Sequence, residues 1–491
     1  MNTIQRRPLL AISGLLLAIG LIGCATTTAP DPVVVIQKAE AAMGGAGLKT
    51  IRFAGTGTGG IFGQAYQAGM PWPKVTVTQF SRALDYENAA LRQDQAITRA
   101  EPNGGGALPL MGTGDQRSVG MLQGTWAWNM NGPNPAASPV ALDGRIHDLW
   151  TSPHGVLKAA LKNKATSGTR TVDGKSYTTL SFTEPGRFEA TAYINADNLV
   201  ERVDTRQPSP VMGDTESVIN FSGYKDWGGV RFPSRIQQDM GGSSVLDIAV
   251  SEVQAGVPAG ASVPDPVRQF AENVASTKVV DGIWFLAGGS HNSVLIEMKD
   301  YAVLVETPLY DGRSAAVLAE VRKLVPGKPL RYVISSHHHF DHAGGLRTAV
   351  SEGVTLLTSA GAKPWYDKVL ANPNRLNPDA LTKSGRSATV ESVGAKRVLS
   401  DGLRTVEISE IADSVHARGL LMMYLPNEKI LIEADAYTPG PPNTPATAQT
   451  LGNNLNLVQN IEQSKLNVER ILPLHGRMVP LSELMTAVGR K

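Results

Sequence analysis

The stretch His337-His338-His339-Phe340-Asp341-His342 decides how the C-terminal half of this 491-residue chain folds. It follows the apolar run Leu330-Arg331-Tyr332-Val333-Ile334, which is typical of a buried strand. In extended backbone, side chains two positions apart point to the same side. We therefore expect His337 and His339 to point together as ligands of one metal ion, while His338 faces away.

The end of the stretch offers ligands for a second ion. Once the chain turns, Asp341 and His342 supply a carboxylate oxygen and an imidazole nitrogen, which suit zinc, manganese or iron. The following Ala343-Gly344-Gly345 permits a tight exit into a helix. A histidine tract alone also occurs as an adventitious metal-binding sequence, so the interpretation depends on residues elsewhere in the chain.

Three further metal-competent residues lie downstream. Asp435 and His475 close apolar, strand-like runs, and His416 follows a similar stretch. Site residues of layered α/β folds lie at such strand ends. These positions favour a built metal site over an adventitious tract.

The order H-x-H-x-D-H, then His, Asp and His, resembles the metallo-β-lactamase superfamily over roughly residues 265 to 491. The resemblance implies two divalent ions, zinc first, with iron or manganese as alternatives. It implies this set of ligands: His337, His339 and His416 on the first ion, Asp341, His342 and His475 on the second, and Asp435 between them. Two ions, a bridging hydroxide and two carboxylates give a nearly neutral cluster, in which bound water loses a proton near neutral pH.

The resemblance implies a metal-dependent hydrolase acting on a small molecule. Bridging hydroxide would attack a carbonyl-type carbon, the second ion would stabilise the leaving group, and Asp341 would be the catalytic residue that positions the nucleophile. Esters, lactones, thioesters and amides such as β-lactams all fit. Two alternatives stay open: iron-dependent sulfur or oxygen redox chemistry on the same ligands, and a non-catalytic envelope lipoprotein that binds a lipid or another ligand.

Two positions depart from the family pattern. Many members carry Asp-Thr-Gly on the strand before the motif, where this chain has Glu306-Thr307-Pro308. The third motif usually reads Gly-His-Thr-x-Gly and here reads Val415-His416-Ala417-Arg418-Gly419. The H-x-x-G spacing survives, and no other histidine lies between residues 342 and 475.

Some residues have less specific signals. His291 lies between the apolar runs 282–287 and 294–297, where it either lines the substrate mouth or is an ordinary turn histidine. Tyr437 begins a proline-rich loop, 437–445, that is a candidate wall of the substrate cleft. The remaining histidines are expected to be structural or solvated: His147, His154 and His338.

The N-terminus resembles a bacterial lipoprotein signal peptide. Residues 1–23 carry Arg6 and Arg7 before an apolar stretch too short to span a membrane, and Leu21-Ile22-Gly23-Cys24 resembles a lipobox. Cys24 is the only cysteine, so it is expected to be lipidated, and residues 24–32 to act as a tether. The predicted location is the periplasmic face of the outer membrane, anchored through the N-terminal lipid.

Charge argues against nucleic-acid partners. Removing residues 1–23 lowers Lys+Arg from 46 to 44, equal to the 44 Asp+Glu, and no basic stripe is present. Binding to a phosphate backbone normally shows as a basic surplus. The sequence carries no signal for an oligomeric state.

Residues 33–257 are expected to form a β-rich, antiparallel accessory domain. A short helix at 33–43 precedes strand-like runs with turn signals between them. The predicted strands are 51–53, 75–80, 83–86, 177–182, 190–194, 218–221, 231–237 and 245–250. The glycine-rich segments 55–60, 103–114 and 131–139 are expected to be flexible connections, and prolines at 256–266 mark the domain boundary.

Residues 265–491 are expected to form an α/β fold, the αββα sandwich of the resembled family. Predicted strands are 279–286, 294–298, 302–306, 331–334 and 354–358, with later strands carrying His416 and Asp435. Predicted helices are 313–324, 453–466 and 481–488.

Overall fold

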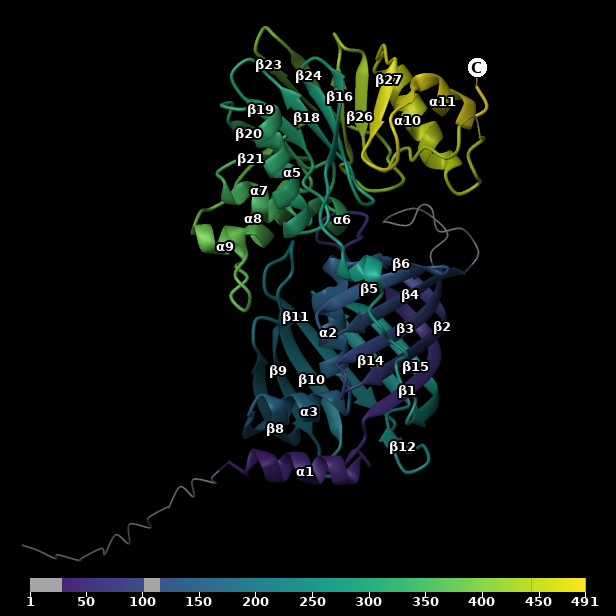
Figure 1. The fold of residues 1–491 in the computed structure, drawn as a ribbon, viewed down its shortest axis with the longest axis vertical. Helices are drawn as coiled ribbons and strands as arrows, with labels where there is room; N and C mark the ends of the chain where they lie inside the picture. The colour runs from purple at the N-terminus through teal and green to yellow at the C-terminus, as the bar shows by residue number, and fades with distance from the viewer. Residues whose placement is uncertain (1–28, 101–114, 443, 491) are drawn as a thin grey trace, which may run out of the picture.

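The computed structural model describes residues 29–100, 115–442 and 444–490. The expected signal peptide and Cys24 lie outside the described residues, as does the glycine-rich segment 103–114. The chain forms two halves, one above the other in Figure 1. The lower half holds one large sheet, and the upper half holds two sheets covered by helices.

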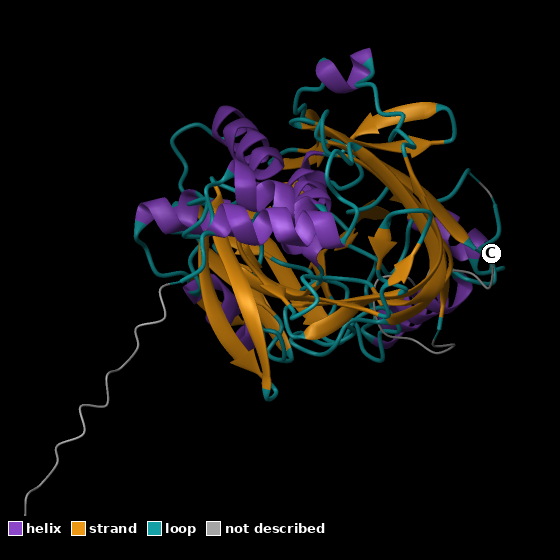
Figure 2. Ribbon diagram, turned by 90° about the horizontal axis from the view of Figure 1, so that it is seen from below, coloured by secondary structure: helices purple, strands orange, loops and turns teal. Residues whose placement is uncertain are grey.

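The first half is built on a 13-stranded antiparallel sheet in the order β6-β5-β4-β3-β2-β1-β15-β14-β11-β10-β9-β8-β7. Its strands are β1 Thr50–Gly60, β2 Lys74–Asp85, β3 Ala90–Arg99, β4 Gln116–Gln123, β5 Trp126–Asn131, β6 Asn134–Ala137, β7 Thr166–Val172, β8 Lys175–Glu184, β9 Phe188–Ile194, β10 Val200–Gln207, β11 Thr215–Ser222, β14 Arg235–Met240 and β15 Ser243–Ala255. A small ribbon pairs β12 Lys225–Asp226 with β13 Arg231–Phe232. The sheet curves strongly (Figure 2), and the antiparallel, β-rich prediction is confirmed.

Helices fill one face of this sheet, toward which alternate strand residues point. In β11, for example, alternate residues are buried. Ile219 and Phe221 of β11 share one core with side chains of α2 Leu142–Trp150 and α3 Gly155–Lys162, while α1 Pro32–Ala42 lies across the lower end in Figure 1. A short 3-10 turn, Pro139–Ala141, leads into α2.

The glycine-rich segment 55–60 is strand, not a connection as the sequence suggested. It belongs to β1, whose register shifts at Ala54/Gly55 and again between Gly55 and Gly57. A Cβ at Gly57 would lie 1.9 Å from the carbonyl oxygen of Asp247 on β15. The glycines therefore permit a close approach of two bulged strands, which is a packing role.

Other predicted boundaries in this half were also wrong. The runs 75–80 and 83–86 form one strand, β2, and the run 231–237 is divided between β13 and β14 at Pro233, which cannot donate to a ladder. The segment 131–139 contains the edge strand β6, paired with β5. Helices α2 and α3 were not predicted.

The second half contains a seven-stranded and a six-stranded sheet. The first has β16 Ala275–Val280, β17 Ile283–Ala287, β18 Ser293–Glu297, β19 Ala302–Val305, β20 Leu330–Ile334, β21 Thr355–Thr358 and β22 Thr389–Ser392. The second has β23 Lys396–Ser400, β24 Thr405–Glu410, β25 Leu421–Leu425, β26 Ile430–Glu433, β27 Arg470–Pro473 and β28 Val479–Pro480. The predicted strand 279–286 is in fact a hairpin, because Gly282 turns the chain with φ of 72°.

The two sheets pack face to face with helices outside. Alternate residues of the first sheet serve two cores: Ile296 and Val303 face the second sheet, while Leu295 and Leu304 face helices. The helices of this half are α5 Asp311–Leu324, α6 Phe340–Ala343, α7 Leu346–Ser351, α8 Lys363–Ala371, α9 Ala380–Ser384, α10 Leu451–Gln463 and α11 Leu481–Ala487. The short helix α4 Asp265–Arg268 packs instead against β5 and β6 of the first half. The αββα prediction is confirmed, as is the helical exit after the histidine motif.

One connection of the first half reaches the second. We call residues 61–73, between β1 and β2, the β1–β2 loop; it extends toward α6 in Figure 1. The backbone nitrogen of Phe340 donates to the carbonyl oxygen of Gly63 at 3.1 Å. Within the described residues, no helix combines the length and apolar character that crossing a membrane requires.

Candidate metal centre

Three imidazoles meet beyond the end of β20. The Nε2 atom of His337 lies 2.9 Å from Nδ1 of His339 and 3.1 Å from Nε2 of His416, and the last two atoms are 2.9 Å apart. His337 and His339 follow β20, whereas His416 lies in the loop between β24 and β25. Segments that follow strands of the seven-stranded and the six-stranded sheet therefore bring these three ligands to one point.

All three rings are buried, between 1 and 3% exposed. Burial, together with neighbouring histidines, lowers the pKa of His337 and His339, and burial lowers the pKa of His416. The rings are therefore neutral at pH 7, which is the form of imidazole that binds a metal ion.

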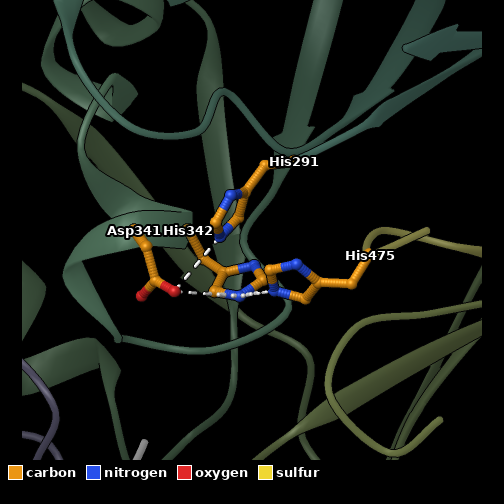
Figure 3. A group of neighbouring side chains, drawn as sticks. All are labelled: His291, Asp341, His342 and His475. Atoms are coloured by element: carbon orange, nitrogen blue, oxygen red, sulfur yellow. Dashed lines mark hydrogen bonds and ion pairs between the residues drawn. The ribbon is translucent and has the colours of Figure 1, made fainter. Parts of the chain in front are cut away.

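A second group lies beside the first, at the start of α6. The Nε2 atoms of His342 and His475 are 3.1 Å apart, and Oδ2 of Asp341 lies 3.8 Å from Nε2 of His342. His291 joins them, with Nε2 3.1 Å from the same Asp341 oxygen. Figure 3 shows these four side chains pointing toward one another.

Asp435, just after β26, lies between the two groups. Its Oδ2 atom is 2.8 Å from Nε2 of His342, 3.4 Å from that of His337 and 3.6 Å from that of His416, and its Oδ1 is 3.2 Å from Nε2 of His475. Despite these neighbours, the buried Oδ2 has no hydrogen-bond partner among the described residues. Ring nitrogens gathered around a carboxylate oxygen that lacks a hydrogen-bond partner are typical of metal ligands, so the donor set fits divalent metal ions.

Glu306 contacts His342 on the ring nitrogen that does not face the other candidate ligands. Its Oε2 is 2.7 Å from Nδ1 of His342, and its Oε1 accepts a hydrogen bond from Ser336 Oγ. Burial alone would lower the pKa of His342, but Glu306, Asp435 and Asp341 raise it well above the ordinary value. This excess of buried negative charge is the condition that a bound cation relieves. At the departure Glu306-Thr307-Pro308, Glu306 therefore supplies a carboxylate that contacts a candidate ligand.

The β1–β2 loop contributes contacts that sequence reasoning missed. The carbonyl oxygen of Ala65 accepts from Nε2 of His338 at 2.7 Å and from Nε2 of His339 at 2.9 Å. Gln64 Nε2 donates to Oδ1 of Asp341 at 2.7 Å. The bond to Ala65 leaves Nδ1 of His339 free to face the other imidazoles, and such outer partners fix the tautomer of a metal ligand. His338 is buried and turned away from both groups, as its position in the motif predicted.

Aromatic and backbone contacts hold the loop in place. Phe62, Trp72 and Phe340 form edge-on ring pairs with centroids 5.0 to 5.9 Å apart. Tyr66 donates its hydroxyl to the carbonyl oxygen of Ser414 at 2.9 Å, in the segment that carries His416. No sequence signal marks this loop, because a backbone carbonyl can act from any residue type.

The remaining histidines and Tyr437 lie elsewhere. Tyr437 is 4% exposed and belongs to the core of the second half. His147 and His154 are buried in the first half, where His147 Nε2 lies 2.9 Å from Thr205 Oγ1. None of these three residues is among the side chains that gather at the two metal groups.

Comparisons with known proteins find similarity to parts of the chain. The sequence model of the metallo-β-lactamase superfamily matches residues 286–442. The 2,4-dinitroanisole O-demethylase subunit alpha of Nocardioides sp. (strain JS1661) is 24% identical over 200 residues, which are 40% of this chain and 57% of that protein. The chain thus matches little more than half the length of this curated relative.

Similar solved structures are also found. A metallo-β-lactamase from Pontibacter korlensis is 18% identical with a TM-score of 0.35, over 44% of this chain and 98% of that one. Rubredoxin oxygen:oxidoreductase from Desulfovibrio gigas is 18% identical with a TM-score of 0.35, over 44% of this chain and 61% of that one. The metallo-β-lactamase FIM-1 from Pseudomonas aeruginosa is 19% identical with a TM-score of 0.33, over 44% and 93%.

Proposed function

We propose that the metallo-β-lactamase domain of this protein is a metal-dependent hydrolase of small molecules with a carbonyl-type reacting centre. The observation that carries the proposal is the unbonded Oδ2 of Asp435, surrounded by imidazoles of two adjoining groups. His337, His339 and His416 would hold one divalent ion, and Asp341, His342 and His475 the other, with Asp435 shared. Two such ions, zinc in the first instance, supply an activated water and polarise a carbonyl oxygen.

The protein's own groups set the direction of approach. The side chain of Asp341 is 33% exposed, against 0% for His337 and His342, so it marks the open edge of the centre. Gln64 Nε2 donates a hydrogen bond to its Oδ1, and Nε2 of His291 lies 3.1 Å from its Oδ2. A carboxylate fixed in this way at the open edge is placed to orient the attacking water by accepting its proton in a hydrogen bond.

A substrate panel with metal removal tests the proposal. Purified protein is assayed on esters, lactones, thioesters, β-lactams and 2,4-dinitroanisole, the compound in the name of the curated relative. We expect hydrolysis of at least one class, loss of it after chelation and recovery on adding zinc. Activity unaffected by complete metal removal contradicts the proposal, and recovery by iron alone with uptake of oxygen selects the redox alternative.

We further propose that the protein is a lipid-anchored envelope protein. This part is supported by the lipobox at residues 21–24 and by Cys24 being the only cysteine. Cys24→Ser should move the protein from the outer-membrane fraction to the soluble fraction. Recovery of the unaltered protein in the cytosol contradicts it.

A further inference from the structure

We infer that His291 is an additional ligand of the second ion, which would then be bound by three imidazoles and Asp341, with Asp435 shared between the ions. The inference rests on the metal pair of the proposed function and changes the composition of one of its sites. His291 lies in the turn between β17 and β18, about 50 residues before the histidine motif, and is 5% exposed.

The distances suit one shared ion. Two ligands that each lie about 2.0 to 2.2 Å from the same ion cannot be more than about 4.4 Å apart. His291 Nε2 lies 3.1 Å from Asp341 Oδ2, which is 3.8 Å from His342 Nε2, which is 3.1 Å from His475 Nε2. All four donor atoms lie within 4.8 Å of one another, so little movement is needed to close them on an ion (Figure 3).

The three rings of this group are held in the same way. Nδ1 of His342 faces Glu306 Oε2 at 2.7 Å, and Nδ1 of His475 donates to the carbonyl oxygen of Ser290 at 3.1 Å. Nδ1 of His291 faces the Oγ of Ser290 at 2.8 Å. Each ring thus has an oxygen partner on Nδ1 and presents Nε2 to the common centre, the usual arrangement of a metal-bound imidazole and its outer partner.

The turn that carries His291 is fastened to the loop that carries His475. The backbone nitrogen of Asn292 donates to the carbonyl oxygen of Leu474 at 2.8 Å. The Nδ2 atom of Asn292 donates to the carbonyl oxygens of Pro473 at 3.2 Å and Gly476 at 2.8 Å. The rings of His291 and His475 consequently lie with centroids 4.1 Å apart.

The alternative is that His291 only donates a hydrogen bond from Nε2 to Asp341. In that case it would be a positioning residue, and the second ion would be bound by Asp341, His342 and His475 besides Asp435. The two roles differ in what can replace the imidazole. A glutamine amide can still donate to a carboxylate, but it is a poor ligand for zinc or cobalt.

Metal binding by the full chain separates these roles. Metal-free wild-type protein and the variants His291→Ala and His291→Gln are titrated with Zn²⁺ and with Co²⁺, and the visible spectrum of Co²⁺ reports the coordination number. His154→Gln, which removes a buried imidazole outside both groups, is the matched control. Thermal unfolding of each metal-free variant checks that it folds. If His291→Ala does not fold, the comparison of His291→Gln with wild type is the test.

We expect wild type and His154→Gln to bind two ions. In both His291 variants the affinity for the second ion should fall by more than about 100-fold, while the affinity for the first ion is unchanged. A loss of about 100-fold is the upper range for removing a residue that only hydrogen-bonds to a metal ligand. The Co²⁺ absorption of the second site should intensify as its coordination number falls. Wild-type binding and spectrum in His291→Gln would overturn the inference, whereas a wild-type protein that binds fewer than two ions would overturn the proposed metal pair instead.

Discussion

The two halves of the molecule contribute to the metal centre in different ways. The second half supplies side chains whose residue types indicate metal binding, such as His337, Asp341 and Asp435. The first half supplies the side chains of Gln64 and Tyr66 and the backbone carbonyls of Gly63, Ala65 and Tyr66. Ligand chemistry is therefore readable in the residue types, while the contacts that orient the ligands depend on where a loop lies in space.

Removal of a ligand from the second half should have the largest effect. In His339→Ala the first ion loses one of three imidazoles, so we expect its affinity and the turnover to fall by more than the roughly 100-fold typical of outer partners. The far-UV circular dichroism signal of the β-rich first half should persist in the spectrum of the full chain. His147→Ala, a buried imidazole of the first half, is the control for metal content, and an equal loss of metal in both variants would contradict the assignment.

Loss of the charge behind His342 should be the next largest effect. Glu306→Gln keeps the shape of the side chain but removes the carboxylate that faces Nδ1 of His342, so metal affinity should fall about 10- to 100-fold. Glu428→Gln is the control, since Glu428 is a part-buried carboxylate paired with Arg404 in the same half. Competition with a chromophoric chelator measures both. Unchanged affinity in Glu306→Gln would show that Glu306 does not tune the site.

The contact made by the first half should have a smaller effect. Gln64→Ala removes a hydrogen bond to the charged Asp341, at a partly exposed position, so we expect kcat/KM to fall about tenfold. Metal content should stay at the wild-type value, because no ligand is lost. Gln67→Ala, in the same β1–β2 loop but bonded to Arg418 at the surface, should leave kcat/KM unchanged. Equal values for both variants would mean that the loop acts only by packing.

The same division explains what the sequence could predict. The αββα fold and the β-rich first half could be predicted, because apolar alternation is a local pattern, and the sheets confirm them. The ligand types of the motif are also a local pattern, and the structure brings these side chains together. Strand β3 was missed because its residues are largely polar and only partly buried, which hides the period of two. The role of Ala65 could not be predicted, since its carbonyl lies more than 270 residues from the histidines that it contacts.

The smallest effect on the metal centre is expected from replacing His147 and His154, two buried histidines that should make the first half less stable in acid. Burial lowers the pKa of both His147 and His154 from 6.5 to about 4, so the folded chain keeps them neutral while the unfolded chain takes up protons below pH 6.5. Stability is thus unaffected above pH 6.5 and decreases as the pH falls toward 4, by up to about 3 kcal/mol for each ring.

Chelator-treated protein isolates this effect from acid release of metal. We expect the unfolding transition of wild type to shift to lower temperature between pH 6.5 and 4, and the shift to shrink in His147→Gln/His154→Gln, which has no such protons to bind. Tryptophan fluorescence follows it, because Trp150 lies in the core that these histidines share. The same shift in both proteins would place the acid sensitivity in other groups. A smaller shift in the variant, with wild-type zinc binding at pH 7.5, would show that the first half carries its own pH dependence and leaves the ligands of the second half undisturbed.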